Sequence, residues 1–445
     1  MTLPLTGFFA LLGGLLVLAY VTNKLTRWTR VPDVIVLMLT GILVGPVLHW
    51  LQGSQFGEIA RGFGTLALIL ILFAAGLELD LRHALRQFGA GLILATVSYG
   101  LTFAGVTYFC IYALALQRIP AILVGASLAC MSGSIVIPVL DQFELRPPVK
   151  TTLVIEASFG DGLGALGLGV ALEYAQNALP TASGPAAALL NHAASSAGHR
   201  GLIAGSVVAL FLFKSLLAMA VAIVAGFLWA RLLPRMSEQQ FWQVLTFAAV
   251  LLVYAGTHAL GGSALFGVMV FGTTLANLPN RGAFSSGTFG FQRFVSEPSH
   301  QIHFFHSELA FLVRSFFFVM LGALVEFSGL KKELLPTLGI VGVFFIARTI
   351  AIEVSRIAWR GTARIEREIA ILLIPRGLIT AVLALEAVAA MPIQLEFLTS
   401  LTFAVILLTS VLVLLASIRA KRLVSVIAPG DVEPVSVIPV GTRGE

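Results

Sequence analysis

Long apolar runs dominate this sequence and limit what the chain can fold into. They recur from near the N-terminus to about residue 418, with short polar or charged stretches between them. A helix of roughly 20 predominantly apolar residues crosses the hydrocarbon core of a bilayer. Charged residues make up 11% of the chain, against about 25% in a typical soluble domain. The sequence therefore predicts an all-α membrane protein with many transmembrane helices.

The lengths of the apolar runs, and the breaks between them, predict thirteen spans. The expected ranges are 5–22, 34–51, 62–79, 88–114, 119–140, 149–175, 202–229, 241–259, 261–278, 308–327, 334–357, 369–390 and 397–418. Two longer connections remain. We expect 176–201 to be external and 279–307 to be a cytoplasmic loop.

The positions of the basic residues indicate the orientation. With the N-terminus outside, most of the 28 Lys and Arg residues fall in cytoplasmic segments, as the positive-inside rule requires. The net charge of +6 is then a topology signal, and no nucleic-acid partner is expected. We expect an integral protein of a bacterial inner (cell) membrane, with a short cytoplasmic tail at 419–445.

Thirteen spans divide into two six-helix repeats joined by the seventh span. Corresponding spans are seven apart, and because this number is odd they cross the membrane in opposite directions. The repeats are therefore inverted, and inverted repeats with broken helices indicate a binding site near the middle of the membrane. Span five contains CMSGSIVIP and span twelve contains IPRGLITAV, and each is interrupted by Gly, Pro and polar residues. The sequence favours two broken helices that cross; two ordinary kinks are the alternative.

Several segments resemble the monovalent cation:proton antiporter superfamily, which includes sodium/proton exchangers and potassium-efflux antiporters. GTLALILILFAAGLELDL, FFIARTIAI and IPRGLITAVLALE are similar to characteristic segments of that superfamily, and EASFGD resembles the E-S-x-x-N-D motif of its electroneutral exchangers. The resemblance implies that Asp161 binds the cation and the proton, and that Glu156 pairs with Arg348. Gly160 replaces the motif's Asn and Ala157 its Ser, so the site has fewer side-chain ligands than the exchanger pattern.

The resemblance also implies a division of labour and a homodimer. Residues 1–86 would form the first part of a scaffold and dimerisation domain, and 202–330 the linker helix and second part of the scaffold. Residues 87–175 and 331–418 would form the moving transport core.

Two acidic residues inside one apolar span need separate explanations. Glu156 and Asp161 are five residues apart, which on a helix is a rise of about 7.5 Å and a rotation of about 140°. They therefore do not share a face. Glu156 is expected to form a structural ion pair with Arg348, because a buried charge left alone costs about 3–5 kcal/mol. Proton carriage by Glu156 itself is the alternative.

Asp161 has no countercharge evident in the sequence. Burial disfavours the ionised form of a carboxylate, whereas Na⁺ or K⁺ stabilises it, so proton and cation would compete for one group. Ser132, Ser134 and Ser158 are the candidate oxygen ligands beside it. A protonated Asp161 hydrogen-bonded within the core is the alternative.

Three basic residues inside spans also need an environment. Arg376 is expected to neutralise the carbonyl end of a half-helix at the break in span twelve, or else to extend towards the cytoplasm. Lys214 and Arg314 are expected to extend their charged ends towards the membrane surface.

These features predict a secondary transporter and not an enzyme. It would exchange Na⁺ or K⁺ for H⁺ by alternating access, and a single titrating carboxylate favours electroneutral exchange. No cofactor is expected, nor any metal beyond the transported cation. A transport-inactive membrane sensor or scaffold of the same fold is the alternative.

The orientation can be tested with cysteines at Asn191 and Arg364, in a chain whose Cys110 and Cys130 are replaced by alanine. An impermeant thiol reagent added outside intact cells should label Asn191→Cys. It should label Arg364→Cys only after the cells are opened, because Arg364 lies in a basic cytoplasmic segment. Labelling of residue 364 in intact cells would reverse the orientation.

Overall fold

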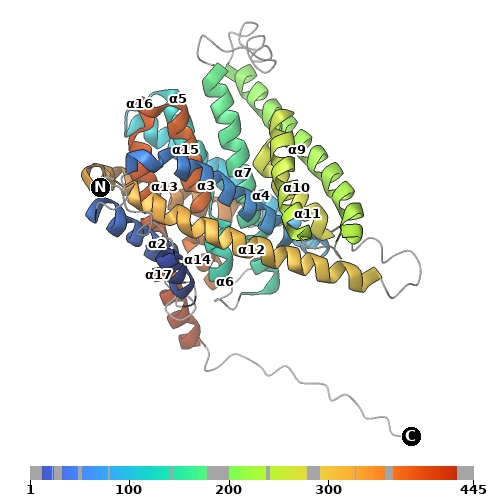
Figure 1. Cartoon of the computed structure of the whole chain (residues 1–445). Helices are drawn as coiled ribbons and strands as arrows, with labels where there is room; N and C mark the ends of the chain where they lie inside the picture. The colour runs from blue at the N-terminus through green and yellow to red at the C-terminus, as the bar shows by residue number, and fades with distance from the viewer. Residues whose placement is uncertain are drawn as a thin grey trace.

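A computed structural model describes most of the chain (Figure 1). The described residues are 13–22, 24, 33–48, 53–78, 81–140, 143, 145–177, 200–236, 241–277, 291–325, 327–355 and 364–427. These residues form helices and short connections, and none of them lies in a strand. The expected all-α class is confirmed.

The helices follow the order of the expected spans, starting with a short helix at Gly13–Thr22. Their bounds are α2 Asp33–Ile42, the π-helix η1 Leu43–Val47, α3 Gly53–Glu78, α4 Leu81–Tyr112, α5 Arg118–Leu128, α6 Gly133–Leu140, α7 Pro147–Asn177, α9 Arg200–Met236, α10 Trp242–Ala259, α11 Ala264–Asn277, α12 Phe291–Ala323, α13 Phe327–Ser355, α14 Arg364–Leu372, α15 Leu378–Ala390, α16 Pro392–Leu395 and α17 Phe397–Ile427.

Length and composition allow seven of the helices in the described ranges to cross a membrane. Shorter apolar helices, including α5, α11 and α15, lie between them in sequence. The count of thirteen spans stays a prediction.

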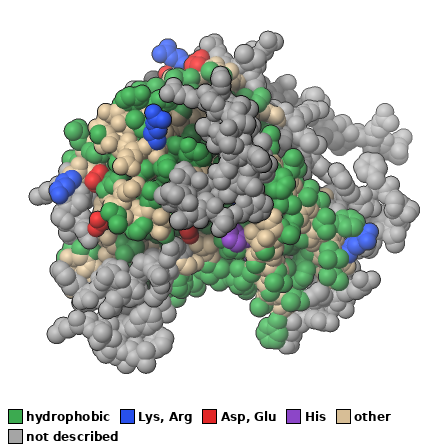
Figure 2. All heavy atoms as spheres, turned by 90° about the horizontal axis from the view of Figure 1, so that it is seen from above, with side chains coloured by type: hydrophobic (Ala, Val, Ile, Leu, Met, Phe, Trp, Pro, Cys, Tyr) green, Lys and Arg blue, Asp and Glu red, His purple; other side chains and the backbone are tan. Residues whose placement is uncertain are grey.

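The outer surface agrees with a membrane environment. Large apolar side chains such as Leu252, Leu335 and Ile393 are exposed, and Figure 2 shows apolar side chains over much of the described surface with only scattered charges. A soluble monomer rarely exposes apolar patches of this extent, whereas lipid tails accommodate them.

The segment before span ten differs from the expectation. Residues 279–307 were expected to form a loop, but α12 already begins at Phe291 and continues without interruption into the apolar stretch Phe304–Ala323. Apolar length marks the part of a helix that lies in lipid, whereas backbone hydrogen bonds extend a helix through polar sequence as well. The expected start of this helix, residue 308, marks where the sequence becomes continuously apolar, whereas the helix itself begins at Phe291.

The helices pack in two sets. In one set α3 packs against α11 and α12, α12 against α2, and α11 against α9. In the other set α4 packs against α5, α7 and α13, and α17 against α13 and α15. The two sets meet where α15 contacts α3 and where α7 contacts α9 and α11.

Both predicted broken helices are present, and their breaks meet. Residues 129–132 separate α5 from α6, and residues 373–377 separate α14 from α15. The backbone N–H of Ser132 donates to the carbonyl of Pro375 at 3.0 Å, and the Thr380 hydroxyl donates to the carbonyl of Cys130 at 3.4 Å. Each break thus supplies partners for backbone groups that the other leaves without a helical bond.

The contact between the breaks requires glycine at position 377. A Cβ atom there would lie 2.8 Å from the Cβ of Ser132. We expect Gly377→Val to destabilise the protein by about 1–3 kcal/mol, because overpacking would push the breaks apart. Thermal unfolding in detergent would measure this. Gly342→Val is the control, since a Cβ at Gly342 meets nothing within 4 Å. Equal unfolding temperatures for the two variants would contradict the prediction.

Candidate ion-binding site

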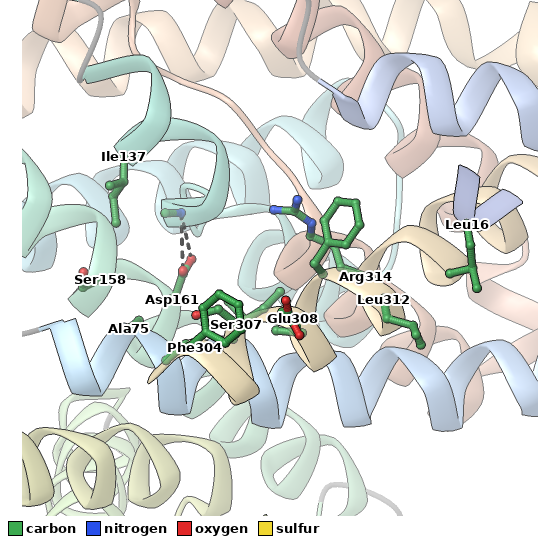
Figure 3. Close-up of a pocket in the computed structure, with 15 residues that line it drawn as sticks. Leu16, Ala75, Ile137, Ser158, Asp161, Phe304, Ser307, Glu308, Leu312 and Arg314 are labelled. Carbon is green, nitrogen blue, oxygen red and sulfur yellow. Dashed lines mark hydrogen bonds between the residues drawn. The ribbon is translucent and has the colours of Figure 1, made fainter. Parts of the chain in front are cut away.

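Helix α7 places Asp161 beside the first residue of α6. Asp161 is buried, with 2% of its surface exposed. The backbone N–H of Gly133 points at its carboxylate, 3.3 Å from Oδ2 and 3.5 Å from Oδ1 (Figure 3). The first N–H groups of a helix have no partner within the helix and carry partial positive charge. The break therefore gives the carboxylate a weak donor, and no residue in the described part of the chain gives it a full countercharge.

Asp161 borders a cavity of about 560 Å³ (Figure 3). The cavity lies between α6 and α7 on one side and α3 and α12 on the other. Its lining residues are Leu16, Ile71, Ala74, Ala75, Gly133, Ile137, Ser158, Asp161, Phe304, Ser307, Glu308, Ala310, Phe311, Leu312 and Arg314. The cavity is thus formed at the junction of the two packing sets, and it is large enough for water and a small ion.

The three predicted serine ligands have different positions. Ser158 lines the cavity together with Asp161, one turn earlier on α7. Ser132 is buried in the break against Gly377 and does not line the cavity. Ser134 follows Gly133 in α6, and its side chain lies outside the described part of the structure. The geometry therefore brings Ser158, but not Ser132, to the cavity that Asp161 borders.

Gly160 leaves space where the exchanger motif has Asn. A Cβ atom at Gly160 would contact only the carbonyl oxygen of Met131, at 3.9 Å. The replacement therefore removes a polar side chain without filling its position with another part of the protein. Water and backbone carbonyls can supply the missing oxygen ligands there.

Glu156 and Arg348 form a buried, two-pronged ion pair. Arg348 Nη1 and Nη2 donate to the two carboxylate oxygens of Glu156, the second at 3.0 Å. Arg348 Nε donates to the carbonyl of Ala370 at 2.9 Å, and Nη1 also donates to Ser98 Oγ at 3.4 Å. The guanidinium thus connects α7, α13, α14 and α4, and both oxygens of Glu156 are occupied.

Arg376 is buried within the bundle and is 3% exposed. Its backbone N–H donates to Thr409 Oγ1 at 3.1 Å, and its guanidinium carbon lies 4.1 Å from the ring centre of Phe344. A side chain that extended to the cytoplasm would be exposed, so this geometry does not match that alternative. Compensation of a half-helix end by Arg376 stays a prediction.

Two basic residues expected at the membrane surface instead have acidic partners. Arg314 pairs with Asp33 at 2.9 Å, joining α12 to α2. Lys214 pairs with Glu173 at 2.5 Å, joining α9 to α7. All four side chains are only 16–20% exposed, so pairing and not extension into water explains these positive charges.

Sequence reasoning missed the contribution of α12 to the cavity. Ser307 and Glu308 line it, whereas the sequence pattern indicates Glu308 only as the first residue of an apolar span. Nothing in the local pattern indicates which way Glu308 faces, because that depends on how α12 packs against α3 and α2.

The ion pair can be tested by a double-mutant cycle. We expect Glu156→Gln and Arg348→Gln each to destabilise the protein by about 3–5 kcal/mol, because each leaves a lone buried charge. The double variant should recover part of the loss in folded yield and thermal stability. Arg364→Gln, which removes an exposed pair with Glu368, should change little and is the control. Losses that simply add in the double variant would contradict coupling.

Comparisons with known proteins match this architecture. The chain is 25% identical to the Na⁺/H⁺ antiporter 1 of Methanocaldococcus jannaschii over 387 residues, covering 84% of this chain and 81% of that protein. It is also 25% identical to the K⁺/H⁺ antiporter NhaP of Alkalimonas amylolytica, covering 79% of this chain and 56% of that protein.

Among solved structures, the M. jannaschii sodium proton antiporter MjNhaP1 at pH 8 superposes with a TM-score of 0.74 at 22% identity, covering 93% of this chain and 98% of that one. This likeness confirms the antiporter fold. The family model "Sodium/hydrogen exchanger, transmembrane" matches residues 13–418, in agreement with the resemblance seen in the motifs. Since that match covers most of its length, the chain belongs to the transmembrane sodium/hydrogen exchanger family.

Proposed function

We propose that this chain is a secondary transporter that exchanges Na⁺ or K⁺ for H⁺ by alternating access. Its relatives include proteins named as Na⁺/H⁺ and K⁺/H⁺ antiporters. The same fold carries an arrangement suited to this exchange, with broken helices at the edge of a cavity that contains a carboxylate.

The environment of Asp161 is the observation that carries the proposal. The carboxylate is buried and borders the cavity, and among the described residues its one hydrogen-bond donor is the Gly133 N–H. No described residue forms an ion pair with it. Arg348, the buried cation that pairs with α7, is bound to Glu156. Asp161 is therefore available to bind either a proton or a cation.

Competition at this one group produces the exchange. A carboxylate away from water is costly when ionised and unpaired, so it either takes up a proton or binds a cation. Ser158, backbone carbonyls and water would supply the remaining oxygen ligands. One group holds one proton or one monovalent cation, and the exchange would be electroneutral.

Two bodies would move relative to each other, with 87–175 and 331–418 as the transport core against a scaffold of 1–86 and 202–330. Support comes from the small residues at their junction. A Cβ at Gly162 on α7 would lie 3.1 Å from Phe266 and 3.3 Å from Met269 on α11, so the surfaces approach closely without interlocking polar groups there. The protein would be a homodimer in the inner membrane, with its N-terminus outside and its C-terminus in the cytoplasm.

The function can be tested by Asp161→Asn, which keeps the size of the side chain and removes its titratable charge. We expect the variant to fold and insert normally, and to lose cation-driven proton flux by at least about a hundredfold. This follows because no described carboxylate replaces Asp161 in the buried part of the cavity. The measurement is collapse of a preset ΔpH in proteoliposomes on addition of Na⁺ or K⁺, with equal amounts of protein.

The control is Glu396→Gln, which removes an exposed acid that is not part of the cavity lining and should transport like wild type. Wild-type exchange should also weaken as the medium is acidified, because protons then outcompete the cation. Near-wild-type flux from Asp161→Asn would reject the proposed mechanism.

A further inference from the structure

The cavity beside Asp161 contains a second carboxylate that the exchange mechanism does not use. Among the described residues that line the cavity, Asp161 and Glu308 are the acidic ones. They come from different helices, Asp161 from α7 and Glu308 from α12 (Figure 3), and these helices belong to different packing sets. A cation that enters this cavity therefore meets negative charge on both packing sets.

The two carboxylates differ in exposure. Asp161 is buried, whereas Glu308 is exposed and lies near the start of the apolar stretch Phe304–Ala323. Of the two acids in the lining, Glu308 is therefore the accessible one and Asp161 is the one shielded from the surroundings. Ser307, the residue before Glu308, also lines the cavity.

The nearby positive charge does not neutralise Glu308. Arg314 lines the same cavity, but its guanidinium is paired with Asp33 at 2.9 Å. Within the described part of the chain, Glu308 has neither a hydrogen-bond partner nor an ion-pair partner. The Arg314–Asp33 pair contributes little net charge, so the cavity keeps the negative potential of Glu308.

We propose that Glu308 is a cation-recruiting residue. It increases the apparent affinity of the transporter for monovalent cations that enter through this cavity. This proposal rests on the proposed function. Glu308 raises the local concentration of Na⁺ or K⁺ at the cavity mouth, and the ion then passes to Asp161. The apolar walls of the cavity have a low dielectric constant and concentrate the electric field of the carboxylate. A single carboxylate at this position can therefore attract cations strongly.

Recruitment and binding predict different kinetic changes. Loss of Glu308 should leave the turnover at saturating cation close to wild type, because Asp161 still exchanges proton for cation. The apparent KM for Na⁺ or K⁺ should rise, since a favourable charge interaction with the entering ion is gone. A solvated surface carboxylate without a role would change neither quantity.

The first experiment measures KM and maximal rate of ΔpH collapse for wild type, Glu308→Gln, Glu308→Asp and Glu396→Gln in proteoliposomes. We expect Glu308→Gln to raise KM about tenfold with a maximal rate within twofold of wild type. Glu308→Asp should restore most of the affinity, and Glu396→Gln should leave KM unchanged. A KM for Glu308→Gln within twofold of wild type would overturn the proposal.

The second experiment changes the charge within one folded protein. Glu308→Cys, in a chain without Cys110 and Cys130, is modified after reconstitution by negatively or positively charged methanethiosulfonate reagents of similar size. The negative adduct should lower KM relative to the unmodified variant, and the positive adduct should raise it. Equal KM values for the two adducts would show that charge at this position has no role, and would overturn the proposal even if Glu308→Gln folded poorly.

The outcomes separate this inference from the proposed function. If wild type collapses no ΔpH with either cation, the proposed function fails. If wild type transports while the two adducts behave alike, recruitment by Glu308 alone fails.

Discussion

Backbone hydrogen bonding in a medium without water is the constraint on which this structure depends. A helix that stops inside a bilayer leaves N–H and C=O groups that lipid cannot satisfy. Here two interruptions meet, and the bond from Ser132 to Pro375 lets each supply what the other lacks. The same arrangement leaves the Gly133 N–H directed at Asp161. The candidate site thus depends on two helix breaks that lie next to each other.

Two acids on one helix have opposite environments. Glu156 is held by the guanidinium of Arg348, which also binds the Ala370 carbonyl, so this pair connects several helices. Asp161 lies on another face of α7, and the one donor to it among the residues that the structure describes is a backbone N–H. A strongly paired carboxylate keeps its charge and contributes to structure, whereas a weakly supported one can change its charge. The spacing of five residues allows one helix to carry both.

The helices, their breaks and the buried ion pair can be predicted from the sequence. The features that depend on how helices pack against one another cannot. Apolar length indicates where most of the helices lie, and Gly133 and Gly377 mark the breaks, because few other features interrupt an apolar helix. Charge balance made a partner for Glu156 necessary. The start of α12 was missed because polar sequence continues a helix beyond lipid. The position of Glu308 in the cavity lining and the pairing of Arg314 depend on helix rotation and tertiary packing, which local sequence does not encode.

The Glu156–Arg348 pair also has a consequence for biosynthesis. The partners are separated by 192 residues, so Glu156 leaves the ribosome long before Arg348 exists. At about 5–20 residues per second, the delay is about 10–40 s. During that interval helix α7 must enter the membrane with an unpaired acid, which costs roughly 2.5–3.5 kcal/mol for a charged group at the bilayer centre. The final pairing of α7 therefore depends on a residue that is made much later, and a nascent chain stopped before Arg348 would contain Glu156 without this partner.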